Sequence, residues 1–148
     1  MTPTATTSDP RETATPLQDV RRLSFNQITA ERESLARAID ACAKHDVPYI
    51  GVWRHKLSEA GLTAAARSLR ESGVRVSSIC RGGMFPAATK ADREARIADN
   101  ERAVDEAATL GAPVLVLVCG AAPDRDIDGA RQMVEDGIAR LAPYAADR

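Results

Sequence analysis

The sequence predicts a parallel α/β fold, and three observations support this prediction. Four apolar or alternating runs are separated by four segments of helical periodicity within the 148 residues. Similar helix-to-strand turns recur at 46–48, 73–75 and 111–113, which is typical of stacked βα units. The first three runs begin about 26 residues apart, a normal length for a βαβ crossover. We therefore expect four βα units, a (β/α)4 arrangement.

The first predicted unit begins with residues 21–28, which alternate apolar and polar side chains as a strand does. A helix is predicted over residues 31–45, with Thr29 as its N-cap. His45 closes this helix, where a cation suits the negative end of the helix dipole. The residues expected on its buried face are Leu35, Ala38, Ile39 and Cys42.

The second and third predicted strands cover residues 48–53 and 74–80. The helix between them ends at Gly73, a residue type that favours helix ends. Another helix is predicted over residues 93–110, with Glu101 as the single charged residue on its apolar face. The apolar positions of these two helices are Leu62, Ala65, Ala66 and Leu69, then Ile97, Val104 and Ala108.

The fourth predicted strand, residues 114–118, contains only apolar residues. Such a run is typical of a central parallel strand covered on both faces. A last helix follows, whose start at 124–128 is acidic, as the helix dipole favours. Its expected apolar face is formed by Ile127, Ala130, Val134, Ile138 and Leu141.

Composition excludes several classes of protein. The net charge is −1 and aromatic residues make up 3%, so a nucleic-acid partner is not expected. No apolar run reaches the roughly 18 residues of a membrane span, and the start lacks a secretory signal. The 3 cysteines are an odd number at wide spacing, which favours a reducing compartment and predicts a cytoplasmic protein.

Two segments differ in composition. Residues 1–20 are rich in Thr, Pro, Ala and Ser and are predicted to be a disordered tail, because they cannot bury enough apolar surface. Residues 21–148 are predicted to form one domain.

Candidate binding residues lie at the carboxyl ends of the predicted strands, where parallel α/β folds carry their sites. Trp53 is expected either to form the floor of a pocket or to pack at the rim. His55 is expected to donate hydrogen bonds or to shuttle a proton. The alternative, a solvated basic turn over residues 53–56, is less favoured for His55. The segment 81–83, Arg-Gly-Gly, either binds an anion through its backbone or only lets a long loop turn, and the second interpretation is favoured. Other strand-end residues are Phe25, Asn26 and Cys80.

Metal and acid–base chemistry is not predicted for these residues. Cys80, Cys119 and His55 match no short metal-binding motif, so a zinc site is not expected. No predicted strand ends in Glu or Asp, so the carboxylate pair that abstracts a proton next to a carbonyl is not evident. No catalytic residue is assigned.

Several motifs together resemble the sugar phosphate isomerase/epimerase family, the group with a xylose isomerase-like TIM barrel. They are Ser-Phe-Asn-Gln at 24–27, Tyr-Ile-Gly-Val-Trp at 49–53, Cys-Arg-Gly-Gly at 80–83 and Leu-Gly-Ala-Pro-Val-Leu-Val at 110–116. The resemblance covers roughly residues 21–148. It implies an eight-stranded barrel, of which these residues would be the first half.

The resemblance also implies the family's chemistry. In that family Glu, Asp, His and Glu from strands five to eight hold a divalent metal, often Mn or Mg, and an enediolate forms from a sugar or hydroxy-carbonyl substrate. This chain is expected to hold no metal and to contribute only the wall of the sugar pocket. The matching residues are Phe25, Asn26, Trp53, His55, Cys80, Arg81, Gly82 and Gly83.

Three interpretations remain open. The chain is an inactive or weakly binding half of an isomerase or epimerase, a non-catalytic half that pairs with a second copy as a homodimer or with another half, or a small open α/β binding domain. A four-stranded half leaves two strand edges and an apolar interior uncovered, which favours pairing.

Overall fold

The computed structural model describes residues 19–148, so nearly all of the predicted tail lies outside the described residues. Strands and helices alternate as predicted. In chain order the elements are β1 (Ser24–Asn26), η1 (Gln27–Ala30), α1 (Leu35–Lys44), β2 (Tyr49–Trp53), α2 (Arg54–Ala60), α3 (Leu62–Ser72), β3 (Arg75–Gly83), α4 (Lys90–Leu110), β4 (Leu115–Val118), η2 (Pro123–Arg125) and α5 (Ile127–Ala146).

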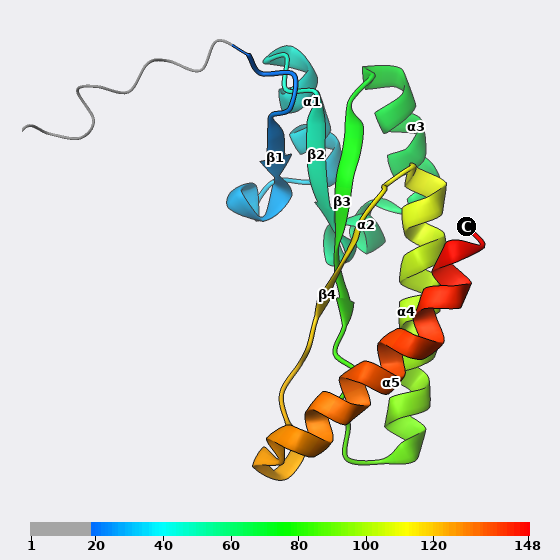
Figure 1. Cartoon of the computed structure of the whole chain (residues 1–148). Helices are drawn as coiled ribbons and strands as arrows, with labels where there is room; N and C mark the ends of the chain where they lie inside the picture. The colour runs from blue at the N-terminus through cyan, green and yellow to red at the C-terminus, as the bar shows by residue number, and fades with distance from the viewer. Residues whose placement is uncertain (1–18) are drawn as a thin grey trace, which may run out of the picture.

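The described strands form one parallel sheet with the order β1-β2-β3-β4. Figure 1 shows the strands side by side, with α3 and α4 running along one side of the sheet. The predicted (β/α)4 arrangement is confirmed. No helix within residues 19–148 combines the length and apolarity needed to cross a membrane.

A large cluster of buried residues, here called the proximal core, lies between the first three strands, the helices α1 to α3 and the end of α4. Ile50, Val52 and Ile79 are fully buried in it, because alternate residues of β2 and β3 face the helices. The predicted faces of α1 and α3 pack against these strands, and Cys42 is buried as expected. Gly73 ends α3 in the left-handed conformation, with φ of 72°.

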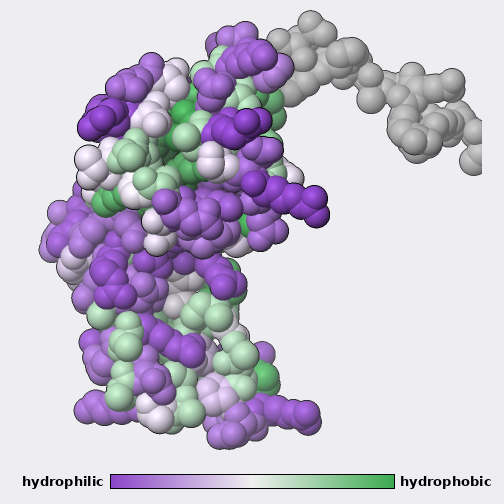
Figure 2. Space-filling model, turned by 180° about the vertical axis from the view of Figure 1, so that it is seen from behind, coloured by the Kyte–Doolittle hydropathy of each residue, from purple (hydrophilic) through white to green (hydrophobic). Residues whose placement is uncertain are grey.

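The long elements β3 and α4 extend beyond the ends of β1 and β2, as Figure 1 shows. Together with β4 and α5 they enclose a second cluster, here called the distal core. It contains four buried residues, Phe85, Ile97, Val104 and Leu141. Seen from behind in Figure 2, the molecule narrows between these two parts.

Strand β3 is longer than predicted. It continues to Gly83, so Arg81 to Gly83 belong to the strand and not to a loop. The pairing of β3 with β4 shifts register between Cys80 and Gly82, which is the irregularity that a β-bulge introduces. Glycine normally indicates a turn, and here it instead permits close packing.

The prediction that the fourth strand is central and covered on both faces is wrong. Strand β4 lies at the edge of the described sheet, and its exposure alternates. Leu115 and Leu117 pack against the two cores, whereas Val116 and Val118 remain 39% and 38% exposed. An all-apolar run shows that both faces are apolar but not what covers them.

The start of α1 and the segment after β2 also differ from the prediction. Ser34, not Thr29, caps α1, because its hydroxyl accepts a hydrogen bond from the Arg37 N–H at 3.3 Å. Thr29 lies in η1 and donates to the Asn26 carbonyl. The short helix α2 was not predicted, since only its Leu57 is buried.

The buried face of α4 contains Ile97 and Val104 as predicted, but Asn100 and Ala107 are buried in place of Glu101 and Ala108. Asn100, not Glu101, is the polar residue in the apolar stripe, and its side chain is 1% exposed. Thr89 caps this helix by accepting a hydrogen bond from the Asp92 N–H. A buried amide requires hydrogen-bond partners, and β3 provides them.

Candidate functional site

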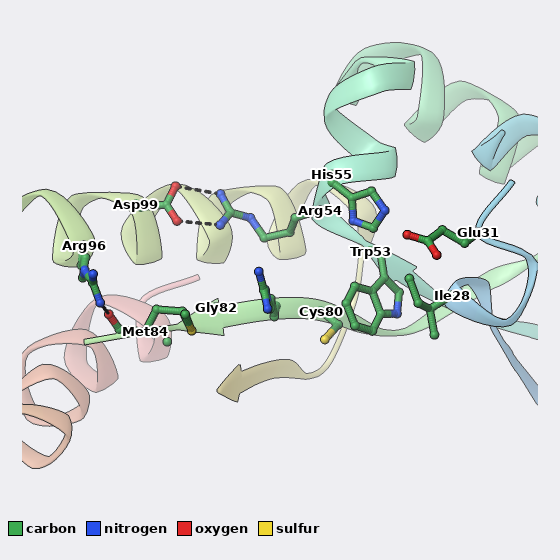
Figure 3. A pocket seen from close by; sticks show the side chains of 12 residues that line it. Ile28, Glu31, Trp53, Arg54, His55, Cys80, Gly82, Met84, Arg96 and Asp99 are labelled. Carbon is green, nitrogen blue, oxygen red and sulfur yellow. Dashed lines mark hydrogen bonds and ion pairs between the residues drawn. The ribbon is translucent and has the colours of Figure 1, made fainter. Parts of the chain in front are cut away.

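A cavity of about 550 Å³ lies at the carboxyl ends of β2 and β3, beside η1 and α4. Figure 3 shows its lining. Six of the residues predicted from the sequence line it, namely Trp53, His55, Cys80, Arg81, Gly82 and Gly83. Further lining residues are Ile28, Glu31, Arg54, Met84, Arg96 and Asp99. The strand-end rule therefore brings six of the eight predicted residues together, and α4 adds residues that the rule does not identify.

Trp53 is held by three contacts. Its indole Nε1 donates to Asn26 Oδ1 at 2.9 Å, and its backbone N–H donates to Gln27 Oε1 at 2.9 Å. The ring meets His55 edge to face, with 5.9 Å between ring centroids and 75° between planes. This geometry is typical of favourable aromatic pairs. Trp53 is thus a fixed wall of the cavity, and Asn26 acts on the cavity by positioning Trp53.

Gln27 is an unusual member of this support. Its side chain is fully buried, and its Nε2 has no hydrogen-bond partner among the described residues. The Oε1 atom is occupied by the Trp53 N–H, so the amide orientation is set by that bond. Gln27 is therefore a structural support of Trp53 and not a lining residue.

Phe25 lies outside the cavity. It is half-buried and packs against the proximal core. Register explains this position, since Phe25 pairs with Ile50, whose side chain also faces the helices. Its neighbour Asn26 points to the other face of the strand, toward Trp53.

Arg54 is not the solvated residue that a basic turn suggests. Its guanidinium, 17% exposed, pairs with Asp99 at 2.8 Å and Glu106 at 2.6 Å, both on α4. Figure 3 shows the paired bonds to Asp99. These hydrogen bonds, first that to Asp99 and then that to Glu106, raise the pKa of Arg54, and Arg54 lowers the pKa of Asp99. The network ties the start of α2 to α4 across the cavity.

The two glycines have a structural role. The Gly83 N–H donates to Asn100 Oδ1 at 2.5 Å, and Asn100 Nδ2 donates to the Gly83 carbonyl at 2.8 Å. A Cβ at Gly82 would lie 2.7 Å from Asn100 Oδ1, and one at Gly83 would collide with Val118. Because Asn100 occupies the Gly83 N–H, the anion-binding interpretation of this backbone group is not supported. The favoured interpretation, a turn in a long loop, is also wrong, because residues 81–83 belong to strand β3.

Polar groups of opposite sign surround the remaining space. Glu31 and His55 point toward one another in Figure 3, and Arg81 is exposed on β3. Arg96 donates to the carbonyls of Met84 and Pro86, which fixes the chain after β3. Burial raises the pKa of the Cys80 thiol, which favours its neutral form. The cavity thus offers one aromatic wall and several hydrogen-bonding groups.

The described residues do not provide a ligand set for the divalent metal that the family resemblance implies. Among residues 19–148, no group of three His, Cys, Asp or Glu side chains lies close enough to hold a metal ion. The carboxylates of Asp99 and Glu106 are engaged by Arg54. Cys80 and Cys119, considered together from the sequence, line different cavities. No step of a reaction through a metal is derived from these residues.

The fold agrees with the result of sequence comparison. Residues 39–148 match the xylose isomerase-like TIM barrel family, and the chain belongs to that family. No curated protein matches the sequence significantly.

Three solved structures show how much of a barrel the chain represents. The protein SMc04130 of Sinorhizobium meliloti is 45% identical, with a TM-score of 0.83 over 87% of this chain and 48% of its own. A D-psicose 3-epimerase crystallised in the presence of D-fructose is 19% identical, with a TM-score of 0.66 over 84% of this chain and 48% of its own. The IOLI protein with a bound zinc atom is 18% identical, with a TM-score of 0.63 over 83% of this chain and 48% of its own. The chain spans about half the length of each.

Proposed function

We propose that the cavity beside Trp53 binds a sugar or a related hydroxy-carbonyl compound, as part of a sugar isomerase or epimerase site. The observation that carries this proposal is the fixed indole wall next to hydrogen-bonding groups at the carboxyl ends of β2 and β3. Small-molecule pockets combine apolar or aromatic walls with a few oriented polar groups in this way. Membership of the xylose isomerase-like family supports the same substrate class.

The proposed roles follow from the chemistry of each side chain. The indole face of Trp53 covers the C–H face of a sugar ring, which excludes water from one side. His55 and Arg81 donate hydrogen bonds to hydroxyl or carbonyl oxygens. Cys80, whose neutral form is favoured, adds a small weakly polar surface.

The chain supplies the substrate-side wall in this proposal. Metal-dependent proton transfer next to a carbonyl is the chemistry that the family implies, with Mn, Mg or a similar divalent ion. The described residues contain no fitting ligand set, so we propose weak substrate binding and no turnover by these residues alone. We also propose a cytoplasmic location, which the odd count of 3 cysteines favours. A net charge of −1 favours a protein without nucleic-acid partners.

Ketose titration tests this proposal. The chain has 1 tryptophan, so its fluorescence reports on the cavity, and calorimetry provides a second readout that also applies to variants without it. We expect D-fructose to bind weakly to the wild type and at least roughly tenfold more weakly to Trp53→Ala, because the covering ring is lost. Trp53→Phe keeps a flat apolar face and is expected to retain more affinity than Trp53→Ala.

A matched control is Tyr144→Ala on α5, which removes an aromatic ring far along the chain from the cavity lining. This variant should bind as the wild type does. Equal calorimetric affinity of the wild type and Trp53→Ala would contradict the assignment of the cavity. Robust isomerisation of ketoses by the chain with added Mn would contradict the proposed role as a wall only.

A further inference from the structure

The positive charges that line the cavity beside Trp53 are not all balanced by carboxylates. Three arginines and two carboxylates line this cavity, namely Arg54, Arg81, Arg96, Glu31 and Asp99. Arg54 is balanced, because it pairs with Asp99 and Glu106. Arg81 and Arg96 form no ion pair with any carboxylate within residues 19–148. The cavity therefore contains two positive charges that can attract an anionic ligand.

Arg96 is held in place by neutral groups. Its Nη1 donates to the carbonyl oxygens of Met84 and Pro86, and its Nε and Nη2 make no hydrogen bond among the described residues. Carbonyl oxygens orient a guanidinium without cancelling its charge, whereas the carboxylates around Arg54 cancel that of Arg54. The Arg96 side chain is half-buried, so water screens its charge less than that of an exposed arginine. A fixed guanidinium with unused donors is suited to bind an anion through two hydrogen bonds.

The two ends of the cavity differ in charge. Figure 3 shows Arg96 beside Met84 at one end, and Trp53, His55 and Glu31 at the other end. Glu31 forms no ion pair within the described residues, so its carboxylate disfavours an anion next to the indole wall. An anionic group is therefore favoured at the Arg96 end and disfavoured at the Trp53 end. A ligand with a neutral sugar part and a terminal anion matches this arrangement.

We propose that the end of the cavity at Arg96, between β3 and α4, binds the anionic group of an acidic sugar, with Arg81 adding a second positive charge. This inference rests on the proposed function, because it places the neutral part of the ligand against Trp53. A carboxylate and a phosphate can each accept two hydrogen bonds from one guanidinium, so the feature that is recognised is a terminal anion. The bonds from Arg96 to Met84 and Pro86 persist, since they use only Nη1.

Three ligands with the same carbon skeleton test the proposal. D-fructose ends in a neutral hydroxymethyl group, D-fructuronate carries a carboxylate in its place, and D-fructose 6-phosphate carries a phosphate there. Calorimetry on the full chain should show at least one of the two anions binding at least roughly tenfold more tightly than D-fructose. The anion that gains more affinity identifies the group that is recognised. Added NaCl should reduce this gain, whereas the affinity for D-fructose should depend little on salt.

Substitutions of the two arginines locate the bound anion. Arg96→Met should lower the ratio of anion affinity to D-fructose affinity roughly tenfold, and Arg96→Lys, which keeps the charge but not the planar fork, should lower it less. Arg81→Gln, at an exposed position, should lower the ratio roughly threefold and remains informative if circular dichroism shows that Arg96→Met does not fold. Arg67→Met, on the exposed face of α3 and outside the cavity lining, is the matched control and should leave the ratio unchanged.

The outcomes distinguish this inference from the proposed function. If neither anion binds more tightly than D-fructose, while D-fructose binding still depends on Trp53, the anion site is overturned and the sugar site stands. If the gain in anion affinity persists in the folded arginine variants, the anion site is also overturned, because the anion binds elsewhere. If the gain is lost in those variants but Trp53→Ala has no effect, the anion site is supported and the sugar site is contradicted. If none of the three ligands binds, both are overturned.

Discussion

In the proximal core fifteen buried apolar residues lie between strands and the helices α1 to α4, whereas the distal core has only four. Polar links hold much of the distal part instead: Asn100 binds Gly83, and Arg96 binds two carbonyls. Arg54 of α2 pairs with two carboxylates of α4 and so connects the two parts. The region next to the cavity therefore depends on directional bonds, because little apolar surface is buried there. Directional bonds fix geometry more narrowly than hydrophobic contact does.

The largest expected effect comes from the proximal core. Ile50→Ala should lower the free energy of unfolding by about 4 kcal/mol, because Ile50 is fully buried and its truncation leaves a cavity. Leu141→Ala in the distal core should cost less, about 2 kcal/mol, because this smaller cluster can collapse onto the gap. Urea denaturation of both variants measures the difference. Equal losses would show that the two cores are not energetically distinct.

Asn100→Ala tests the polar link of the distal part. It leaves the buried N–H and carbonyl of Gly83 without their partner, so we expect a loss of about 2 kcal/mol and faster amide exchange in the second half of β3. Gln132→Ala removes an exposed amide on α5 and should change stability by less than about 0.5 kcal/mol. Similar small changes in both variants would mean that Asn100 does not hold β3.

Arg54→Met should have the smallest effect, about 1 kcal/mol at neutral pH and low salt, since its partners are partly exposed. Arg54 lowers the folded-state pKa of Asp99, so the contribution of this pair is present above the unfolded pKa of an Asp and is lost as the pH falls through the folded value. The difference between variant and wild type should therefore shrink below about pH 4.

Denaturation at pH 7 and at pH 3 measures this change. Arg37→Met, which breaks an exposed pair with Glu33, serves as the control and should have little effect at either pH. A difference for Arg54→Met that is independent of pH would point to lost packing of its aliphatic stem and not to the ion pair.

Much of the fold follows from local pattern. The alternation of strands and helices, the faces of α1 and α3 and the end of α3 at Gly73 depend on periodicity and on glycine at helix ends. The exposed face of β4 does not follow, because an apolar strand has the same sequence pattern whether or not another layer covers it. The extension of β3 through Gly83 depends on Asn100, seventeen residues away, and no local rule identifies that partner.

Part of the candidate site could also be predicted, because it follows from where the strands end. Parallel strands bring their carboxyl ends to one edge, so Trp53, His55 and Cys80 could be grouped from the sequence, and the structure places them along one cavity. Sequence reasoning missed Arg54, Arg96 and Asp99. They reach the cavity only because α2 and α4 pack beside β3, which no local pattern shows. The one available signal was a polar residue within the apolar stripe of α4, and it was assigned to Glu101 instead of Asn100.

The carboxamide of Asn100 presents Gly83 with a donor and an acceptor, as a neighbouring peptide group would, so at this point a helix takes the place of a strand partner. The contact between Asn100 and Gly83 therefore limits where residues can be inserted. One added residue inside α4 before Asn100 turns the following side chains by about 100° and moves the amide away from the strand. Residues added between Pro86 and Thr89 instead lengthen only the connection before the helix cap. Length variation among relatives should therefore be found in that connection and be excluded from the first half of α4.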